Sequence, residues 1–244
     1  MVIPAYKEEK RLRVSLPRIL EYLQGCDYAW EILVVDDGSP DRTSEAAKEL
    51  LAGSPHTVLR NEPNAGKGAS IRRGMLESRG AHALFTDADL STPIEDVERM
   101  WSEIEKGADV VFGSRTLPES ELIVRQPFVR EMGGRVFNVL VRMLVLGGFS
   151  DTQCGFKMFT RRAANIVFPL QKMDGFVFDV EILAIAKEAG LKLRDVPVRW
   201  EDSPVSTLNP ITDGLKTYAD LLKVRKRIKE LKREGAIERQ RAAT

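Results

Sequence analysis

The stretch Leu84-Phe85-Thr86-Asp87-Ala88-Asp89-Leu90-Ser91-Thr92-Pro93 decides the fold, because a short apolar run ends there in two carboxylates just before a helix start. Thr92 suits the N-cap, Pro93 the first helical position, and Glu95 the acid of a capping box. The carboxylates are therefore expected at the carboxyl end of a strand, where open α/β sheets bind ligands. Two hard oxygen donors suit Mg²⁺ or Mn²⁺ shared with phosphate oxygens.

An Asp-x-Asp pair is also common in solvated loops, so the remaining chain has to support this interpretation. Further apolar runs end in polar turns before helical patterns, and the second helix is expected to be capped by Ser39 and to start at Pro40. Four such strand-turn-helix units in succession predict a mostly parallel sheet flanked by helices. The turns are Pro4-Ala5-Tyr6-Lys7-Glu8, Asp36-Asp37-Gly38-Ser39, Asn64-Ala65-Gly66-Lys67-Gly68, Asp87-Ala88-Asp89 and, after the next strand, Gly113-Ser114-Arg115.

Composition limits the classes of protein that fit. The 244 residues can form one large α/β domain with or without a small appendage, and 37 basic against 36 acidic residues leave no global field for nucleic acid. Cys26 and Cys154 cannot build a disulfide framework or a cysteine-rich metal site, which fits reduced, cytoplasmic surroundings.

The strand-helix alternation ends after Arg115. A basic segment with Arg125, Arg130 and Arg135 leads into the apolar 136–149 segment, which is expected to form a helix that is buried or lies at an interface. Residues 150–159 are expected to be a loop entering a strand, 193–198 the last strand and 205–210 a loop. No stretch reaches the roughly 18–20 apolar residues of a spanning helix, so the chain is expected to be soluble or peripherally attached.

The C-terminal segment is expected to be one amphipathic helix from Asp213 whose apolar positions soon give way to charge, which divides the chain into residues 1–212 and 213–244. It is rich in lysine and arginine, so it is either a solvated tail or a membrane-surface anchor to which each basic residue adds about 1 kcal/mol.

Four of the motifs in this order resemble the family 2 glycosyltransferases, whose GT-A fold is a Rossmann-like nucleotide-binding sheet. They are Pro4 to Glu8, Val35 to Ser39, Asn64 to Gly68, and Asp87 to Asp89. Gly113 to Arg115, Asp151 to Lys157 and Phe178 to Glu181 resemble the polyprenol-phosphate branch of this family, especially the dolichyl-phosphate β-glucosyltransferases. The resemblance covers about residues 2–227.

The resemblance implies a role for each matched residue. Pro4, Ala5, Tyr6 and Glu8 would frame the nucleotide-sugar, and Asp36 or Asp37 would bind its base or ribose. Asp87, Ala88 and Asp89 would hold the diphosphate, with Asp87 and Asp89 as metal ligands and Ser91 as a further metal-shell group. Arg115 and Arg130 match arginines that hold phosphates, and Arg135 is a weaker match. Two departures are Lys7 in place of the usual asparagine and Thr207 after Ser206, where a lysine is common.

Lys67 lies in a Gly-Lys-Gly turn that lacks the glycine and hydroxyl spacing of a P-loop. It is either a point charge for a phosphate or carboxylate, as in binding the nucleotide-sugar, or simply exposed to solvent.

The acceptor decides which catalytic groups are needed. A sugar hydroxyl needs a carboxylate base, for which Asp179 or Glu181 would serve, whereas a phosphate acceptor is already anionic near neutral pH and needs cations such as Arg115, Arg130 and Arg135. The arginines followed by an apolar segment favour a lipid phosphate. We therefore expect inverting, metal-dependent transfer of glucose from UDP-glucose to polyprenyl phosphate on the cytoplasmic face of a membrane, with Asp89, Arg115, Arg130 and Asp179 as catalytic residues. In this reaction Asp179 would orient the donor sugar or an arginine.

Other readings remain open at this stage. GDP-mannose or UDP-GlcNAc could be the donor, or a saccharide hydroxyl the acceptor with Asp179 or Glu181 as base. A nucleotide-sugar-binding protein without turnover, or an interaction module with a basic coiled tail, would also fit parts of the sequence.

Overall fold

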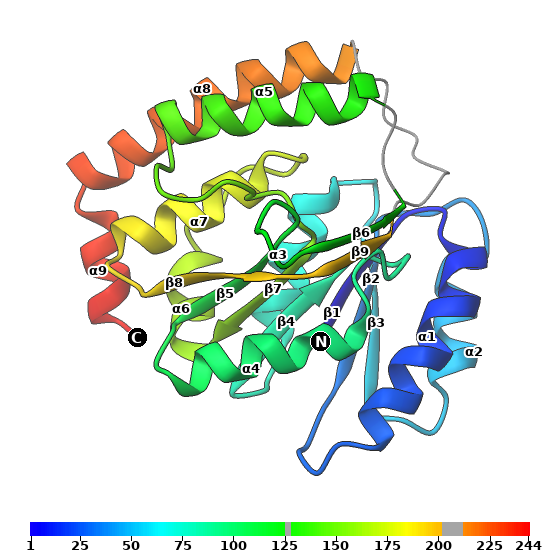
Figure 1. Cartoon of the computed structure of the whole chain (residues 1–244). Helices are drawn as coiled ribbons and strands as arrows, with labels where there is room; N and C mark the ends of the chain where they lie inside the picture. Colours follow the sequence, from blue (N-terminus) through cyan, green and yellow to red (C-terminus); the bar gives the residue numbers. More distant parts are fainter. Residues whose placement is uncertain (125–127, 202–211) are drawn as a thin grey trace.

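A mostly parallel sheet runs through the middle of the molecule (Figure 1). The computed structural model describes residues 1–124, 128–201 and 212–244. Only β7 is antiparallel to its neighbours in this sheet, and a separate pair of parallel strands joins β6 (Glu121–Val124) to β9 (Arg199–Glu201). The seven strands of the main sheet lie in the order β3 (His56–Arg60), β2 (Ile32–Asp36), β1 (Val2–Ala5), β4 (His82–Thr86), β7 (Phe156–Thr160), β5 (Val110–Ser114) and β8 (Leu193–Pro197).

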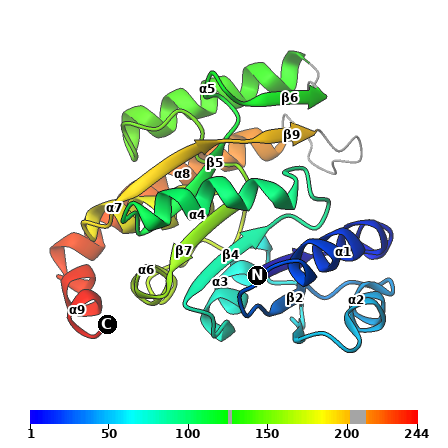
Figure 2. The ribbon, with the colours of Figure 1, turned by 60° about the horizontal axis from the view of Figure 1, so that its bottom comes forward.

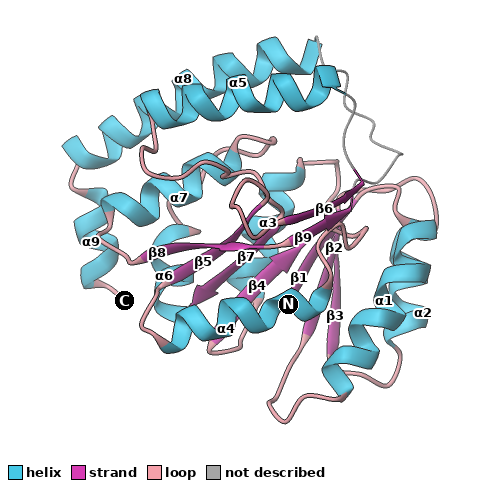
Figure 3. Ribbon diagram, in the orientation of Figure 1, coloured by secondary structure: helices cyan, strands magenta, loops and turns pink. Residues whose placement is uncertain are grey.

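Helices cover both faces of this sheet, as the predicted GT-A architecture requires (Figures 2 and 3). One face carries α1 (Glu9–Gln24), α2 (Thr43–Leu51), the short 3-10 helix η1 (Ile94–Asp96) and α4 (Val97–Glu105). The other carries α3 (Lys67–Glu77), α5 (Phe128–Leu144), α6 (Arg161–Val167), α7 (Phe178–Glu188), α8 (Thr212–Arg233) and α9 (Ala236–Ala242).

The central strands are buried on both sides, which explains their continuous apolar sequences. In β2, Leu33 and Val35 join the core beneath α3 and α7, while Ile32 and Val34 join the core beneath α1 and α2. One charged residue, Lys157 of β7, occupies a fully buried position between apolar neighbours. It therefore requires a partner inside the protein.

Two predicted helix starts are wrong. The hydroxyl of Ser39 accepts a hydrogen bond from the backbone N–H of Lys7 at 2.9 Å, and α2 begins four residues later, at Thr43. Thr92 lies against Cys154, with 3.8 Å between Oγ1 and Sγ, and caps no helix; a 3-10 turn begins at Ile94 and α4 at Val97. Both hydroxyls bond across the fold, which the local sequence does not reveal.

The expected single C-terminal helix is two helices, because Gly235 adopts a left-handed conformation with φ of 61° between α8 and α9. The apolar face of α8 also continues further than expected, since Leu221, Val224, Ile228 and Leu231 are all buried in the core that contains the sheet. In the described part of the chain, no helix is both long and apolar enough to cross a bilayer. Arg125 and the loop expected at 205–210 lie outside the described residues.

Gly74 lets α3 approach β1 and β2 closely. A Cβ atom there would lie 2.3 Å from Cγ1 of Val2 and 3.0 Å from Cγ2 of Val35, and both valines are stiff core residues. We expect Gly74→Ala to lower the free energy of unfolding by about 1–3 kcal/mol through overpacking. Urea unfolding followed by circular dichroism measures this. Gly133→Ala on α5 is the control, because its Cβ would meet nothing within 4 Å; equal losses in both variants would contradict the packing argument.

Candidate active site

The carboxyl ends of the parallel strands bring most of the predicted site residues to one edge of the sheet. The register aligns Ala5 of β1 with Asp36 of β2, and β4 lies on the other side of β1. Lys67 begins α3 and Asp179 lies in the first turn of α7. The residues at the strand ends are Pro4, Ala5, Tyr6 and Glu8 after β1, Asp36 and Asp37 at β2, Asp87, Ala88 and Asp89 after β4, and Arg115 after β5.

Asp87 is held from two sides. Its Oδ1 forms an ion pair with Nζ of Lys67 at 2.6 Å. Its carboxylate also sits against the backbone of Gly155, where a Cβ would lie 2.1 Å from Oδ2. Gly155 thus leaves the space that the carboxylate occupies. Burial lowers the pKa of Lys67, but the charges of Asp87 and Asp179 outweigh it and the net shift is upward.

Asp89 turns back onto its own loop. Its Oδ1 accepts hydrogen bonds from the backbone N–H of Ser91 at 3.0 Å and from the Ser91 hydroxyl at 2.9 Å, while Leu90 between them has a positive φ of 50°. The carbonyl of Ser91 accepts from the N–H of Glu201 at 2.9 Å, which ties this loop to β9. Ser91 therefore orients Asp89.

Asp36 is completely buried and its carboxylate is used inside the protein. It accepts hydrogen bonds from the N–H of Ser39 at 2.9 Å and from the hydroxyl of Ser44, and it pairs with Nη1 of Arg60 at 2.7 Å. Asp36 thereby joins the β2–α2 turn to the end of β3.

Asp37 organises the loop before α3. Its carboxylate accepts from the side-chain amide of Asn61 at 2.8 Å, from the N–H of Ala65 at 3.0 Å and from the N–H of Gly66 at 2.8 Å. These contacts set the position of Lys67, the next residue along the chain. Asp37 thus acts on the edge through a loop that it shapes.

Glu8 lies close enough to Asp87 and Asp89 to interact with their charges, and Tyr6 precedes it by two residues. Burial raises the pKa of Glu8 and Arg11 opposes the shift, while the charges of Asp89 and Asp87 raise it further. Glu8 also accepts a 2.6 Å hydrogen bond from Nη1 of Arg11. Tyr6 exposes its ring to solvent, with Nζ of Lys7 5.1 Å from the ring centroid. The edge thus concentrates negative charge next to an exposed aromatic ring.

The buried Lys157 pairs with Asp179 across the core. Its ammonium group donates to Oδ1 of Asp179 and to the carbonyl of Cys154, and it lies 5.4 Å from the centroid of Phe85. Burial raises the pKa of Asp179, and the charges of Lys157 and Lys67 oppose that shift. Asp179 is therefore paired with Lys157 and also interacts with the charges of Lys67 and Arg115.

Glu181, two residues further along α7, is enclosed by the protein. Its Oε2 accepts from the N–H groups of Lys172 at 3.0 Å and Met173 at 2.7 Å, and its side chain has no exposed surface. Burial raises its pKa, and those backbone hydrogen bonds oppose the shift. Glu181 is thus used to hold the 172–173 loop against α7.

Arg115 is fastened by a bidentate ion pair. Its Nε and Nη2 lie 2.7 and 2.9 Å from the two carboxylate oxygens of the buried Asp151, and its guanidinium stacks 5.4 Å from the centroid of Trp200. Burial alone would raise the pKa of Asp151, but Arg115 lowers it to about 2. Among the described residues, Nη1 of Arg115 has no protein hydrogen-bond partner.

Arg130 and Arg135 lie on α5, which leaves the sheet after Arg115 and returns at Asp151. Their side chains lie outside the described part of the structure. The structure therefore places these two residues by their backbone alone, on the helix that follows the site.

The donor set at Asp87 and Asp89 fits a divalent cation. The carboxylates of Asp87, Asp89 and Glu8 lie near one another, and Lys67 pairs with Asp87 while Arg11 pairs with Glu8. Carboxylate oxygens are ligands that Mg²⁺ and Mn²⁺ prefer. In the ranges that the structure describes, no cluster of three or more His, Cys, Asp or Glu side chains could hold a metal ion. A cation here would rely on the two aspartates together with substrate phosphates and water.

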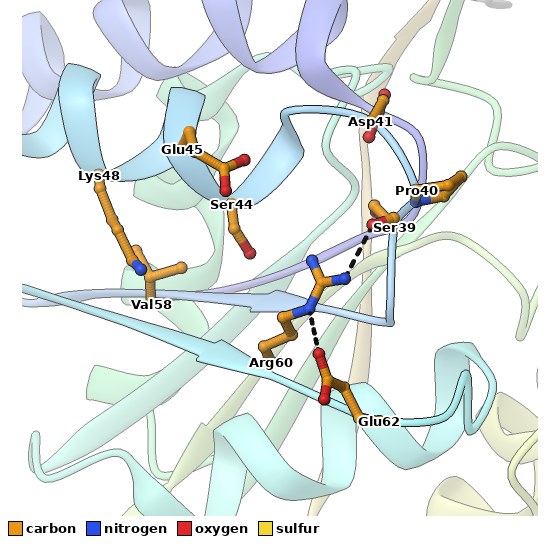
Figure 4. Close-up of a pocket in the computed structure, with 9 residues that line it drawn as sticks. All are labelled: Ser39, Pro40, Asp41, Ser44, Glu45, Lys48, Val58, Arg60 and Glu62. Atoms are coloured by element: carbon orange, nitrogen blue, oxygen red, sulfur yellow. Dashed lines mark hydrogen bonds and ion pairs between the residues drawn. The ribbon is translucent and has the colours of Figure 1, made fainter.

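Two polar hollows lie beside this edge. One, of about 440 Å³, lies between α2 and β3 and is lined by Arg60 with Ser39 and Ser44, the residues that bond Asp36 (Figure 4). The other, of about 770 Å³, is formed by the 61–65 loop with Arg73 and Asp174. Neither is lined by Asp87, Asp89 or Arg115.

Several residues of the site escaped the sequence analysis. Asp151, Gly155 and Lys157 were noted as parts of a motif, but no role was assigned to them. A signal exists for Lys157, since a single lysine inside Phe156-Lys157-Met158-Phe159 predicts a buried charge in need of a partner. The role of Arg60 has no local signal, because its partner Asp36 lies on the neighbouring strand.

This fold and this edge of acidic and basic groups define a glycosyltransferase. The chain belongs to the family described as Glycosyl transferase family 2, whose model matches residues 1–167. It is 38% identical over 234 residues to the dolichyl-phosphate beta-glucosyltransferase ALG5D of Trichomonas vaginalis, an alignment that covers 91% of this chain and 71% of the relative. It is 37% identical to the dolichyl-phosphate beta-glucosyltransferase of Homo sapiens, with 93% and 74% covered.

Solved structures share the fold at lower identity. Mannosyl-3-phosphoglycerate synthase from Rubrobacter xylanophilus superposes with a TM-score of 0.69 at 19% identity, covering 96% of this chain and 74% of that one. Glucosyl-3-phosphoglycerate synthase from Mycobacterium tuberculosis, solved with Mn²⁺ and UDP-glucose, gives 0.64 at 19% identity, with 92% and 77% covered. The predicted fold class and family are thus confirmed.

The Arg115–Asp151 pair makes a testable contribution to stability. Because the pKa of Asp151 is lowered to about 2 in the folded state, its carboxylate stabilises the fold above its unfolded pKa of about 4. That contribution is lost as the pH falls toward the folded value. We expect Asp151→Asn to lower the free energy of unfolding by about 3 kcal/mol at pH 7. The difference from wild type should narrow between about pH 4 and pH 2.

Urea unfolding at a series of pH values measures this difference. Glu103→Gln removes the surface pair of Glu103 with Lys106 and should cost less than about 1 kcal/mol. A loss for Asp151→Asn that is as small as the control, or that stays constant with pH, would contradict the assignment.

Proposed function

We propose that this glycosyltransferase transfers glucose from UDP-glucose to the phosphate of a dolichyl or related polyprenyl lipid, with inversion at the anomeric carbon. The observation that carries the proposal is the identity of 31–38% over more than nine-tenths of the chain to relatives named dolichyl-phosphate beta-glucosyltransferases. UDP-glucose is α-linked, so the β linkage in those names requires inversion.

The donor lies along the edge formed by β1, β2 and β4. Pro4, Ala5 and Tyr6 frame the nucleotide, and the exposed ring of Tyr6 supplies a face for stacking. Asp36 and Asp37 contribute through the turns that they hold, because their carboxylates already accept several hydrogen bonds from the protein.

A divalent cation, Mg²⁺ or Mn²⁺, supplies charge to offset the negative charge that develops on the departing diphosphate. Asp87 and Asp89 would hold it, Ser91 orients Asp89, and Gly155 leaves room for Asp87. Lys67 adds a second positive charge next to the diphosphate once it leaves Asp87.

The acceptor phosphate needs positioning more than it needs a base. Its second pKa is about 6, so it carries an anionic oxygen at neutral pH. Nη1 of Arg115 is not used by Asp151 and has no hydrogen-bond partner in the described part of the chain, and Arg130 and Arg135 lie on the helix that follows. Because Asp151 already neutralises Arg115, the arginine contributes mainly geometry, and Arg130 and Arg135 supply further charge.

Asp179 and Glu181 are poor candidates for a base toward a saccharide hydroxyl. Asp179 is engaged by Lys157 and interacts with Lys67, while Glu181 is enclosed and bonded to the 172–173 backbone. We assign Asp179 the role of positioning Lys67 beside the donor. The lipid acceptor also implies peripheral attachment to the cytoplasmic face of a membrane.

The test is transfer from radiolabelled UDP-glucose to detergent-dispersed dolichyl phosphate with Mg²⁺ or Mn²⁺. We expect metal-dependent glycolipid, little product from GDP-mannose or UDP-GlcNAc, and none with free sugars or 3-phosphoglycerate as acceptor. Asp89→Ala should abolish transfer, and Gly155→Ala should reduce it about 100-fold by displacing Asp87. Product on a free sugar but not on the lipid would overturn the proposal, as would full activity of Asp89→Ala.

The ion pair between Lys67 and Asp87 predicts how metal and donor binding are coupled. A cation that binds Asp87 has to displace or repel the ammonium group 2.6 Å from Oδ1, and the donor diphosphate offers that group another anionic partner. We expect Lys67→Met to bind Mn²⁺ about tenfold more tightly than wild type without nucleotide. The gain in Mn²⁺ affinity that UDP produces should be smaller in the variant.

Electron paramagnetic resonance of free Mn²⁺ measures both affinities. Lys7→Met is the matched control, because Lys7 lies at the same edge but contacts the Tyr6 ring, and among the described residues it forms no ion pair with Asp87. Weaker or unchanged Mn²⁺ binding by Lys67→Met would show that the lysine does not compete for Asp87.

A further inference from the structure

Helix α5 carries an apolar stripe on its outward face. Met132, Val136, Val139 and Met143 are exposed by 42%, 48%, 48% and 75%. At 3.6 residues per turn these four positions fall within about 60° of one another around the helix axis. They therefore form one continuous row along the helix.

The opposite face of α5 is the one that packs against the protein. Phe137 and Val141 are buried in the main core, and the ring of Phe137 lies 5.9 Å from that of Tyr218 on α8. A helix of a water-soluble protein normally needs one apolar face. The second face of α5 has no partner among the described residues and marks an interaction surface.

Helix α8 lies beside α5 on the same side of the molecule (Figures 1 and 3). Its segment 217–233 contains seven basic and two acidic residues, whereas the rest of the chain contains 30 basic and 34 acidic residues. The buried side of α8 is apolar, whereas Lys226 and Lys229 are exposed on the other side. An apolar row next to a basic helix face is complementary to a surface that is apolar inside and anionic outside.

We propose that the outward faces of α5 and α8 dock onto an anionic lipid bilayer, with the α5 stripe inserted at the level of the headgroups and α8 lying over the lipid charges. This inference deepens the proposed function and rests on it for the acceptor. Amphipathic helices with this division of apolar and basic faces bind in the plane of the bilayer surface. The occupant is thus a lipid surface with negative charge.

The position of α5 in the chain connects this surface to the site. The segment 115–151, which we call the α5 excursion, leaves the sheet at Arg115 and returns at Asp151, and these two residues form an ion pair at 2.7 Å. Beside them, the hydroxyls of Thr116 and Ser150 lie 2.7 Å apart. A lipid phosphate at the bilayer surface would therefore enter next to Arg115, with its chain remaining in the bilayer under α5.

Co-sedimentation of the full chain with vesicles of phosphatidylcholine alone or with 30% phosphatidylserine tests this surface. We expect wild type to bind the anionic vesicles, and 0.5 M salt to weaken that binding. Lys226→Glu/Lys229→Glu should bind anionic vesicles at least tenfold more weakly, since each basic residue near such a surface raises the affinity roughly fivefold. Val139→Glu/Met143→Glu should lose at least tenfold on the same vesicles and at high salt as well.

Matched changes elsewhere on the surface serve as controls. Val14→Glu/Leu76→Glu places two acids at exposed apolar positions of α1 and α3, and Arg18→Glu/Arg79→Glu makes the same change of charge as the α8 variant. Both controls should bind as wild type does. Equal losses in test and control variants, or none in any, would overturn the proposal. So would loss of a dimer, rather than of vesicle binding, when Val139 and Met143 are changed.

Transfer assays separate this surface from the reaction. Val139→Glu/Met143→Glu should retain glucosyl transfer to a short polyprenyl phosphate in detergent and lose transfer to dolichyl phosphate in vesicles. If the variant loses vesicle binding and wild type transfers glucose in neither assay, the surface is supported and the proposed reaction is rejected. If the variant transfers glucose in both assays and binds vesicles as wild type does, the surface is rejected and the reaction is supported.

Discussion

Lys157 sets the strongest constraint in this structure, because an ammonium group without solvent has to be paired where it lies. Its partner, Asp179, comes from the first turn of α7, so the pair connects the antiparallel strand β7 to the helix that covers it. The same carboxylate interacts with Lys67, which pairs with Asp87. A row of alternating charges thus runs from the interior to the edge of the sheet, and the position of each member depends on the one before.

The acidic residues at the edge divide into two groups with different work. Asp36, Asp37 and Asp151 are buried. The carboxylates of Asp36 and Asp37 accept hydrogen bonds from neighbouring turns, and that of Asp151 pairs with Arg115. Asp87 and Asp89 keep part of their surface open to solvent. Rigid turns around two accessible carboxylates are a suitable arrangement for a site that binds charged phosphates, since little reorganisation is needed when the ligand arrives.

Local pattern was enough to predict the strands of the main sheet and the edge where the site lies. It did not predict β6 or β9, so the strand expected at 193–198 is not the last one in the chain. Ile32 to Val35 before Asp36 and Ala83 to Phe85 before Thr86 and Asp87 are continuous apolar runs, so their carboxyl ends could be recognised without partners. The antiparallel direction of β7 was missed because its neighbours β4 and β5 lie far away in the chain. Ser39 and Thr92 misled for the same reason, since each hydroxyl bonds to a distant residue in place of a helix end.

The closed base of the α5 excursion gives this enzyme a modular layout. Two contacts join the start and the end of this segment next to the sheet: Arg115 with Asp151, and Thr116 with Ser150. The length and surface of the excursion can therefore vary through insertion or exchange while the geometry of the sheet edge stays the same. Evolution could alter the acceptor half of such an enzyme as a cassette, independently of the half that holds the sugar donor.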